Sequence, residues 1–130
     1  MAIRCLIVDD NSRFAQTAQE VLQEDGIDVV GVASGGQEAM RLARELRPDL
    51  ALVDIDLGAE SGLDVAYRLR ADEPEALADA VILISTHAQK EFAELIAASP
   101  AVGFIAKAEL SADSIQALLD GSAQERGGVI

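Results

Sequence analysis

Short apolar stretches of strand length alternate five times with segments of helical periodicity along this chain. Alternation of this kind is typical of a parallel sheet that helices cover on both faces. The carboxyl ends of parallel strands share one edge of the sheet, and ligands bind in the crevice there. The apolar stretches at residues 3–8, 49–53, 81–84 and 102–106 are each followed by polar residues. We therefore expect these residues to meet in one small site: Asp9, Asp10, Asp54, Ser85 and Lys107.

Composition limits the classes of protein that fit. The chain has 130 residues, half of them apolar but only 3% aromatic, which predicts one domain with an aliphatic core. A net charge of −13 argues against binding of nucleic acid by this domain, because phosphate contacts need Lys and Arg. Cys5 is the only cysteine, so no disulfide framework is expected. No charged leader or membrane-spanning run is visible, and we expect a cytoplasmic protein that does not enter a membrane.

Helical periodicity and stop signals place the elements between the strands. Ser34 to Gln37 has the spacing of a capping box that opens the second helix, which Pro48 ends. Phe92, Leu95 and Ile96 have helical spacing in a further segment, which Pro100 ends. We predict one domain over residues 1–121 and a flexible tail over residues 122–130. The expected helices cover residues 12–25, 34–47, 62–72 and 88–99 and a last segment that Ser111 caps, and a further strand covers residues 27–33.

Three clustered carboxylates favour a divalent cation. Without one, Asp9, Asp10 and Asp54 would repel each other and raise each other's pKa. Hard oxygen ligands suit Mg²⁺ or Mn²⁺, which bind through one or two carboxylates and keep several waters. Together with the ammonium group of Lys107, a divalent cation would balance the three negative charges. Such a site is neutral before chemistry and can accept a phosphoryl group.

Asp54 is the candidate nucleophile, because carboxylates can form aspartyl-phosphate intermediates. Phosphoryl transfer asks a protein mainly for positioning and charge neutralisation. We expect Lys107 to neutralise one phosphoryl oxygen and the hydroxyl of Ser85 to donate a hydrogen bond to another. Lys107 is one of only two lysines among ten basic residues, which indicates that a compact charge is needed at this strand end.

These residues resemble the receiver domain of two-component response regulators over about residues 3–120. The resemblance rests on four segments in the same order and at the same separations: Leu6-Ile-Val-Asp-Asp10, Val53-Asp-Ile-Asp-Leu57 with Gly62, Val81-Ile-Leu-Ile-Ser85, and Gly103-Phe-Ile-Ala-Lys107. It implies an α/β, flavodoxin-like fold, a doubly wound five-stranded parallel sheet with strand order 2-1-3-4-5.

The resemblance also implies the chemistry of the site. Asp54 would accept a phosphoryl group from the phosphohistidine of a sensor histidine kinase or a phosphotransfer protein. Asp10, Asp54 and the backbone carbonyl of Asp56 would hold Mg²⁺, and Asp9 would act largely through metal-bound water. Catalysis would be limited to self-phosphorylation and autodephosphorylation, so the domain is not expected to be an enzyme. A separate hypothesis follows from the place of His87 just past Ser85: Asp56 and His87 would flank the phosphoryl group and set how fast water removes it.

The family's switch would couple Ser85 to Phe104. On phosphorylation the hydroxyl moves toward the phosphoryl group and the aromatic ring turns inward. This change would alter the face formed by the fourth helix, fifth main strand and fifth helix, where a downstream protein binds. A phosphorylation-dependent homodimer is a further assembly that the resemblance leaves open.

Two departures and several alternatives stand beside this interpretation. Gly58 and Ala108 occupy positions where the family often has proline, and Gly58 would loosen the loop after Asp54. Asp54-Ile-Asp56 also matches the Asp-x-Asp motif of haloacid-dehalogenase-type phosphatases, but those enzymes carry their nucleophile on the first strand. A binding-only receiver that is never phosphorylated is the third hypothesis. Residue by residue, ordinary roles also fit: turn or cap for the aspartates, surface for Ser85 and Lys107, core for Phe104, and an exposed loop for His87.

Overall fold

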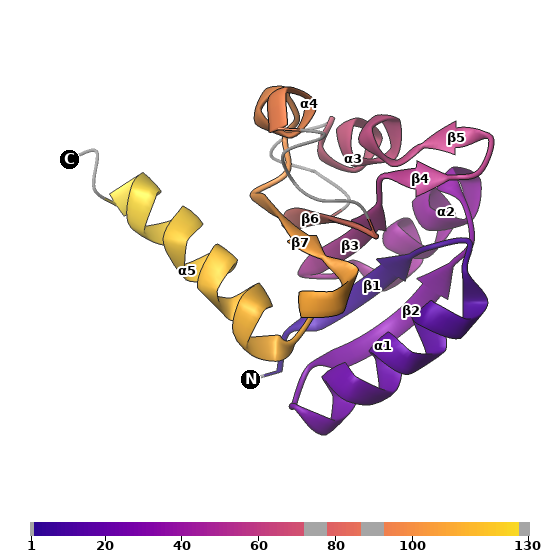
Figure 1. Ribbon diagram of the computed structural model, residues 1–130, viewed down its shortest axis with the longest axis horizontal. Helices are drawn as coiled ribbons and strands as arrows, with labels where there is room; N and C mark the ends of the chain where they lie inside the picture. Colours follow the sequence, from indigo (N-terminus) through magenta and orange to yellow (C-terminus); the bar gives the residue numbers. More distant parts are fainter. Residues whose placement is uncertain (1, 72–77, 87–92, 128–130) are drawn as a thin grey trace.

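A five-stranded parallel sheet forms the centre of the molecule (Figure 1). The computed structural model describes residues 2–71, 78–86 and 93–127. The strand order is β2-β1-β3-β6-β7, which is the order 2-1-3-4-5 when the five long strands are counted along the chain. The sequence-based prediction of a flavodoxin-like sheet is therefore confirmed. The five strands are β1 (Arg4–Val8), β2 (Asp28–Ala33), β3 (Leu50–Asp54), β6 (Ala80–Ser85) and β7 (Gly103–Ala106).

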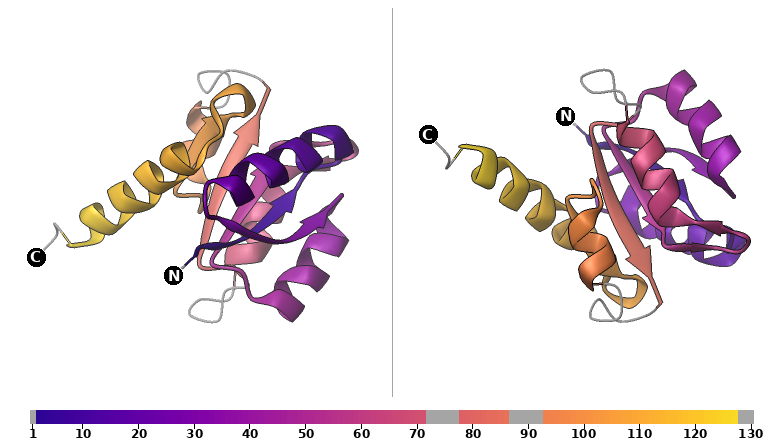
Figure 2. Two further views of the ribbon diagram at one scale, coloured as in Figure 1. Left: turned by 90° about the horizontal axis from the view of Figure 1, so that it is seen from below. Right: turned by 90° about the horizontal axis from the view of Figure 1, so that it is seen from above.

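Helices cover both faces of this sheet (Figures 1 and 2). One apolar cluster joins the sheet to α2, α3 and α4, and a second joins it to α1 and α5. The described helices are α1 (Ser12–Glu24), α2 (Gly36–Leu46), α3 (Gly62–Arg70), α4 (Ala93–Ala98) and α5 (Ala112–Gly127), with a short 3₁₀ turn, η2 (Lys107–Glu109), before α5.

The first strand shows how the aliphatic sequence builds both clusters. Side chains alternate across a strand, so Leu6 and Val8 enter one cluster while Cys5 and Ile7 enter the other. All four are fully buried. Burying one Leu or Ile side chain contributes about 1.5–3 kcal/mol, so the central strands hold the fold with almost no aromatic residues.

The helix ends follow local capping chemistry. Asn11 is the N-cap of α1, and its side-chain oxygen accepts a hydrogen bond from the Phe14 backbone N–H. At the start of α2, the backbone N–H of Ser34 donates to the carboxylate of Glu38, so the side chain that reaches back is that of Glu38 and not, as predicted, that of Gln37. The helix begins one residue later than a capping box at Ser34 requires, because Gly35 is its N-cap. Arg47, in the left-handed conformation, ends α2.

Helices α4 and α5 show details that the sequence pattern does not give. Leu95 on α4 is 54% exposed, whereas Ile96 is buried against the sheet; Phe92 lies outside the described residues. Helix α5 continues to Gly127, so residues 122–127 are helical, while the flexibility predicted for residues 122–130 stays a prediction. Figure 2 shows the C-terminal part of α5 extending beyond the sheet. A Cβ at Gly121 would meet no atom within 4 Å, which fits this projection.

A small hairpin follows β3 and shapes the edge where the site lies. Strand β4 (Asp56–Leu57) pairs with β5 (Glu60–Ser61) in antiparallel fashion. Gly58, in the two-residue turn between them, has φ of +71°, which a proline ring forbids. Replacing the family's proline by glycine therefore forms a tight turn here, where a looser loop was expected.

Among the helices that the structure describes, none has both the length and the apolar character needed to cross a bilayer.

Candidate functional site

The ends of β1 and β3 bring three carboxylates together. Each of Asp9, Asp10 and Asp54 offers one carboxylate oxygen, and these oxygens lie within 4.8 Å of one another. Parallel pairing of Val8 with Val53 aligns the two strand ends, which explains how Asp9 and Asp54, 45 positions apart, become neighbours. Asp9 and Asp54 are buried, while Asp10 is exposed at the mouth of the site.

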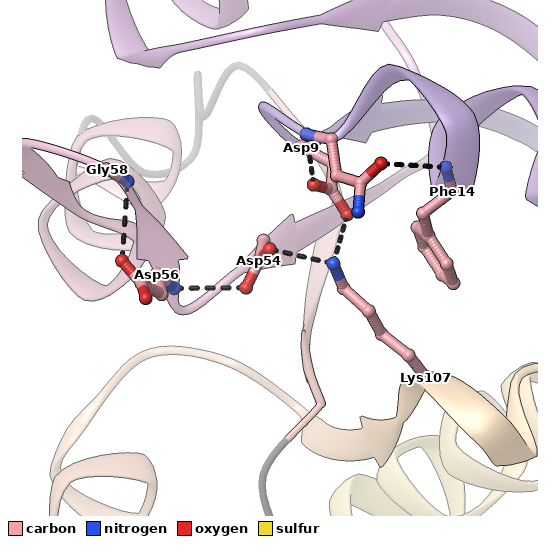
Figure 3. Close-up of polar contacts among 7 residues, drawn as sticks. Asp9, Phe14, Asp54, Asp56, Gly58 and Lys107 are labelled. Carbon is pink, nitrogen blue, oxygen red and sulfur yellow. Dashed lines mark hydrogen bonds and ion pairs between the residues drawn. The ribbon is translucent and has the colours of Figure 1, made fainter.

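Lys107 reaches into this cluster from the end of β7. Its Nζ atom lies 2.7 Å from Oδ2 of Asp9 and 2.9 Å from Oδ2 of Asp54 (Figure 3). The side chain of Lys107 is only 9% exposed, so these ion pairs are largely removed from solvent. The predicted meeting of the lysine with the carboxylates is present in the structure.

Burial and charge pull the pKa values of this cluster in opposite directions. Burial raises the pKa of Asp54, and the hydrogen bonds from Lys107 and from the backbone of Asp56 only partly offset that rise. The negative charge of Asp9 raises the pKa of Asp54 further. Burial alone would lower the pKa of Lys107, but its bonds to Asp9 and Asp54 raise that pKa above the ordinary value. The lysine is therefore held in its charged form.

The donor set fits a hard divalent cation. Among the residues that the structure describes, the three carboxylates of this cluster face the ammonium group of Lys107, so they carry excess negative charge, and oxygen atoms are the ligands that Mg²⁺ prefers. Asp10 provides an accessible oxygen: a Cβ at Gly58 would lie 3.3 Å from Oδ2 of Asp10, so the glycine leaves that side of the carboxylate open.

The loop after Asp54 is fixed by hydrogen bonds to its own backbone. Oδ1 of Asp54 accepts from the Asp56 N–H at 3.0 Å, and Oδ1 of Asp56 accepts from the Gly58 N–H at 3.3 Å (Figure 3). The N–H of Gly62 donates to the carbonyl of Ile55 at 2.7 Å. A Cβ at Gly62 would lie 1.8 Å from the carbonyl oxygen of Asp54, so only glycine fits at the start of α3. This loop therefore fixes the rotamer of Asp54.

Ser85 and Phe104 lie on the same face of the sheet. Ser85 is buried at the end of β6, one residue beyond Ile84, which pairs with Asp54. Phe104 pairs with Leu83 across β6 and β7, and its half-buried ring packs against the cluster of α2, α3 and α4. Leu83 and Ser85 are two residues apart on β6, so their side chains lie on the same face of the sheet. Ser85 therefore lies on the same face as Phe104, which pairs with Leu83.

Some site predictions lie beyond this geometry, and some contacts were missed. His87 lies outside the described residues, so its place next to Asp56 stays a prediction. Asn11 was missed although its position before the first helix is the usual place of an N-cap, and its backbone N–H donates to Oδ1 of Asp9 at 2.8 Å. The ring of Phe14 lies under Lys107, 4.4 Å from Nζ to the ring centroid, a contact without a local sequence signal.

Comparisons with known proteins point to one family. The family model described as "Response regulator receiver domain" matches residues 5–120. Response regulator GacA of Pseudomonas viridiflava is 30% identical over 117 residues, covering 89% of this chain and 53% of that protein. Transcriptional regulatory protein PdtaR of Mycobacterium tuberculosis is 30% identical over 115 residues, covering 88% of this chain and 54% of that protein. The chain thus spans about half the length of these curated relatives.

A solved structure agrees over the full length of the chain. The signal receiver domain of a modulated diguanylate cyclase from Desulfovibrio desulfuricans G20 is 32% identical, with a TM-score of 0.78 and complete coverage of both chains. The receiver domain of NarL from Mycobacterium tuberculosis also has a TM-score of 0.78, with 28% identity, covering 94% of this chain and 97% of that one.

Proposed function

Since this chain belongs to the family of response regulator receiver domains, which are the phosphoacceptors of two-component systems, we propose that Asp54 is its phosphoacceptor residue. One observation carries this assignment. Asp54 is the buried carboxylate at the end of the central strand β3, with one oxygen 2.9 Å from the ammonium of Lys107 and the other held by the Asp56 N–H. Its two neighbours, Asp9 and Asp10, directly follow β1, and their carboxylates are suited to assist the reaction at Asp54.

The proposed reaction transfers a phosphoryl group from a phosphohistidine of a sensor histidine kinase or a phosphotransfer protein. A carboxylate oxygen of Asp54 forms a bond to phosphorus while the bond between phosphorus and the imidazole nitrogen breaks. The imidazole leaves with the electron pair of that bond and takes up a proton. Lys107 neutralises charge on the phosphoryl oxygens, and the hydroxyl of Ser85 donates a hydrogen bond to one of them.

We assign Asp10, Asp54 and the backbone carbonyl of Asp56 as the residues that would hold Mg²⁺ or Mn²⁺, with Asp9 beside them. The bound ion supplies positive charge that offsets the charge of the transferred group. The protein's own contribution is to hold the three carboxylates together despite their repulsion, through the contacts of Lys107 with Asp9 and Asp54.

Incubation with acetyl phosphate and Mg²⁺, followed by intact mass measurement, tests the phosphoacceptor. We expect the wild-type chain to gain one phosphoryl group and Asp54→Asn to gain none. Asp28→Asn is a matched control, because Asp28 is exposed at the opposite end of the edge strand β2, and it should be phosphorylated normally. Normal labelling of Asp54→Asn would contradict the assignment, and a wild-type chain that stays unlabelled would favour the binding-only hypothesis.

The switch is proposed to run from Ser85 to Phe104 along their shared sheet face. It would alter the surface of α4, β7 and α5, on which a downstream protein binds. Ser85→Ala is expected to be phosphorylated but to lose the change in the environment of Phe104, measured by NMR of that ring with and without phosphorylation. An unchanged response in Ser85→Ala would refute the coupling. Sedimentation of both forms tests the phosphorylation-dependent homodimer.

Asp56 and His87 are proposed to set the lifetime of the phosphorylated state. The carboxylate of Asp56 is exposed and hydrogen-bonded to the Gly58 N–H beside Asp54, which suits a group that controls the approach of water. Joint substitution to Asn and Ala, respectively, should change the rate of autodephosphorylation while leaving labelling intact. An unchanged rate removes both residues from this role.

The remaining assignments concern context. We propose a cytoplasmic domain that binds neither nucleic acid nor membrane by itself and that catalyses no reaction beyond its own phosphorylation and dephosphorylation. The net charge of −13 supports the absence of nucleic-acid binding, because contacts with phosphates need Lys and Arg. A haloacid-dehalogenase-type phosphatase has no support in the comparisons, and absence of turnover of p-nitrophenyl phosphate is the expected result.

A further inference from the structure

Lys107 is enclosed on three sides, and one of these sides is aromatic. Two sides are the carboxylates of Asp9 and Asp54, and the third is the ring of Phe14, whose centroid lies 4.4 Å from Nζ (Figure 3). A cation within about 6 Å of a ring centroid is attracted by the negative face of the ring. We propose that Phe14 is a positioning residue that holds the ammonium of Lys107 where the phosphoryl group arrives, an inference that rests on the proposed function of Asp54.

The position of Phe14 is itself tied to the acidic cluster. Its backbone N–H donates to Oδ1 of Asn11 at 3.1 Å, and the N–H of Asn11 donates to Oδ1 of Asp9 at 2.8 Å. The other carboxylate oxygen of Asp9 contacts Nζ of Lys107, which lies over the Phe14 ring. These four residues thus form a closed chain of contacts. Any movement of the first turn of α1 moves the ring relative to the lysine.

The ring also confines the aliphatic part of the lysine side chain. Phe14 and Lys107 line a small groove between α1 and the residues after β7, together with Ala18, Val21 and Leu110. The Phe14 ring is half-buried and packs against the cluster that joins α1 and α5 to the sheet. A lysine side chain has a flexible four-carbon stem, so a fixed apolar wall reduces the number of places its amino group can occupy.

An aromatic partner suits this place better than another polar residue. The cluster already holds three carboxylates and one cation, so a further carboxylate would add repulsion. An aromatic face attracts the ammonium without adding net charge and without competing for the hydrogen bonds that Lys107 must give to a phosphoryl oxygen. Lys107 can therefore exchange a carboxylate for a phosphoryl oxygen while its contact with the ring persists.

Fluorinated phenylalanines at position 14 test the role of the ring face. Fluorine withdraws electrons from the ring face while changing the size of the ring little. We expect the rate of phosphorylation by acetyl phosphate at saturating Mg²⁺ to fall stepwise with one, two and three fluorines, by up to about tenfold. Phe14→Leu should lose a similar factor, and Phe14→Trp should retain most of the rate. Val21→Ala trims another side chain of the same groove and leaves the ring of Phe14 in place, so it should keep the wild-type rate.

Lysine NMR gives a second readout that does not need phosphorylation. The chain has two lysines, so selective ¹³C labelling yields signals from Lys107 and Lys90 only. We expect the signal of Lys107 to be shifted by the ring and to move toward the free-lysine position in Phe14→Leu, while the signal of Lys90 stays unchanged. If the NMR signal of Lys107 is shifted by the ring but the protein is never phosphorylated, the proposed function of Asp54 is refuted, while the contact between Phe14 and Lys107 stands. The role of Phe14 is overturned if neither the Lys107 signal nor the phosphorylation rate changes on fluorination of Phe14 or in Phe14→Leu.

Discussion

The amino group of Lys107 lies 2.7 Å from Oδ2 of Asp9, whose side chain is completely buried. This pair connects the end of β1 to the end of β7, and the strands β3 and β6 lie between them in the sheet. A buried carboxylate that loses its cation is left uncompensated in a medium of low dielectric constant, which is costly. Lys107 therefore contributes to stability as well as to the proposed chemistry.

Lys107→Ala should lower the free energy of unfolding by about 3 kcal/mol or more in EDTA, because Asp9 and Asp54 lose their shared cation. Added Mg²⁺ should restore part of the loss. Urea denaturation with and without the metal measures both effects. Arg41→Ala is the matched control: its pairs with Glu38 and Glu45 are exposed, and it should cost less than about 1 kcal/mol. Equal stability of Lys107→Ala and the wild type in EDTA would contradict this account.

The pH dependence of this contribution follows from the raised pKa of Lys107. A lysine whose pKa is higher in the folded state contributes stability that is complete below its ordinary value of 10.5. The contribution is lost only as the pH rises through the folded value. The difference in stability between the wild type and Lys107→Ala attributable to this group should therefore stay constant from neutral pH to just below 10.5 and decline above it, and a decline that begins well below 10.5 would argue against a raised pKa.

Gly62→Ala should destabilise the fold by about 3 kcal/mol or more, since the new methyl group would overlap the carbonyl of Asp54, and backbone atoms cannot rotate away. The variant should also be phosphorylated more slowly because the end of β3 must shift. Gly121→Ala provides the opposite control within the same chain: nothing lies within 4 Å of its added carbon, and alanine favours a helix over glycine by about 1 kcal/mol. A well-folded, normally phosphorylated Gly62→Ala would show that the loop can relax.

The main contacts of the site could be predicted because they depend on strand topology. Once the alternating pattern predicts a parallel sheet, the edge rule alone brings Asp9 and Asp54 together, and a cation is needed to balance them. The exchange of Gln37 for Glu38 as capping partner shows the limit of spacing rules: either residue can reach back, and the charged one forms the bond.

Contacts between distant segments that strand topology does not dictate were beyond sequence reasoning. Glu60 lies 24 residues from Gly36, and nothing in either neighbourhood signals that the carboxylate accepts the Gly36 N–H at 2.9 Å. The exposure of Leu95 was also missed, because apolar spacing does not say which turn of a short helix faces the sheet. The glycine at position 58 suggested a loose loop, yet the positive φ that glycine permits forms a tight hairpin.

Glu60→Ala should cost about 1 kcal/mol of stability, because Gly35, the N-cap of α2, has no side chain and Glu60 supplies the missing acceptor. Glu60→Gln should lose less, since the amide oxygen can still accept. Glu45→Ala removes an exposed carboxylate from the same helix and should change stability by less than about 0.5 kcal/mol. Thermal or urea unfolding ranks the three variants, and equal effects of Glu60→Ala and Glu45→Ala would refute the proposed cap.

Cys5 should be inert in the native protein. It lies fully buried in the middle of β1, and burial raises the pKa of its thiol to about 12, so almost no thiolate is present at neutral pH. Labelling by a thiol reagent should therefore proceed only through unfolding, and its rate should rise with added urea.

In the unfolded chain the thiol of Cys5 ionises near its ordinary value of 9.0, so the folded protein binds more protons above that pH and its stability falls as the pH rises. The slope should reach about 1.4 kcal/mol per pH unit for this group. Cys5→Ala is less stable at neutral pH because of the space it leaves, but it should lack this part of the alkaline decline. Rapid labelling of the native protein, or the same alkaline slope in both proteins, would show that the thiol is not shielded by the sheet.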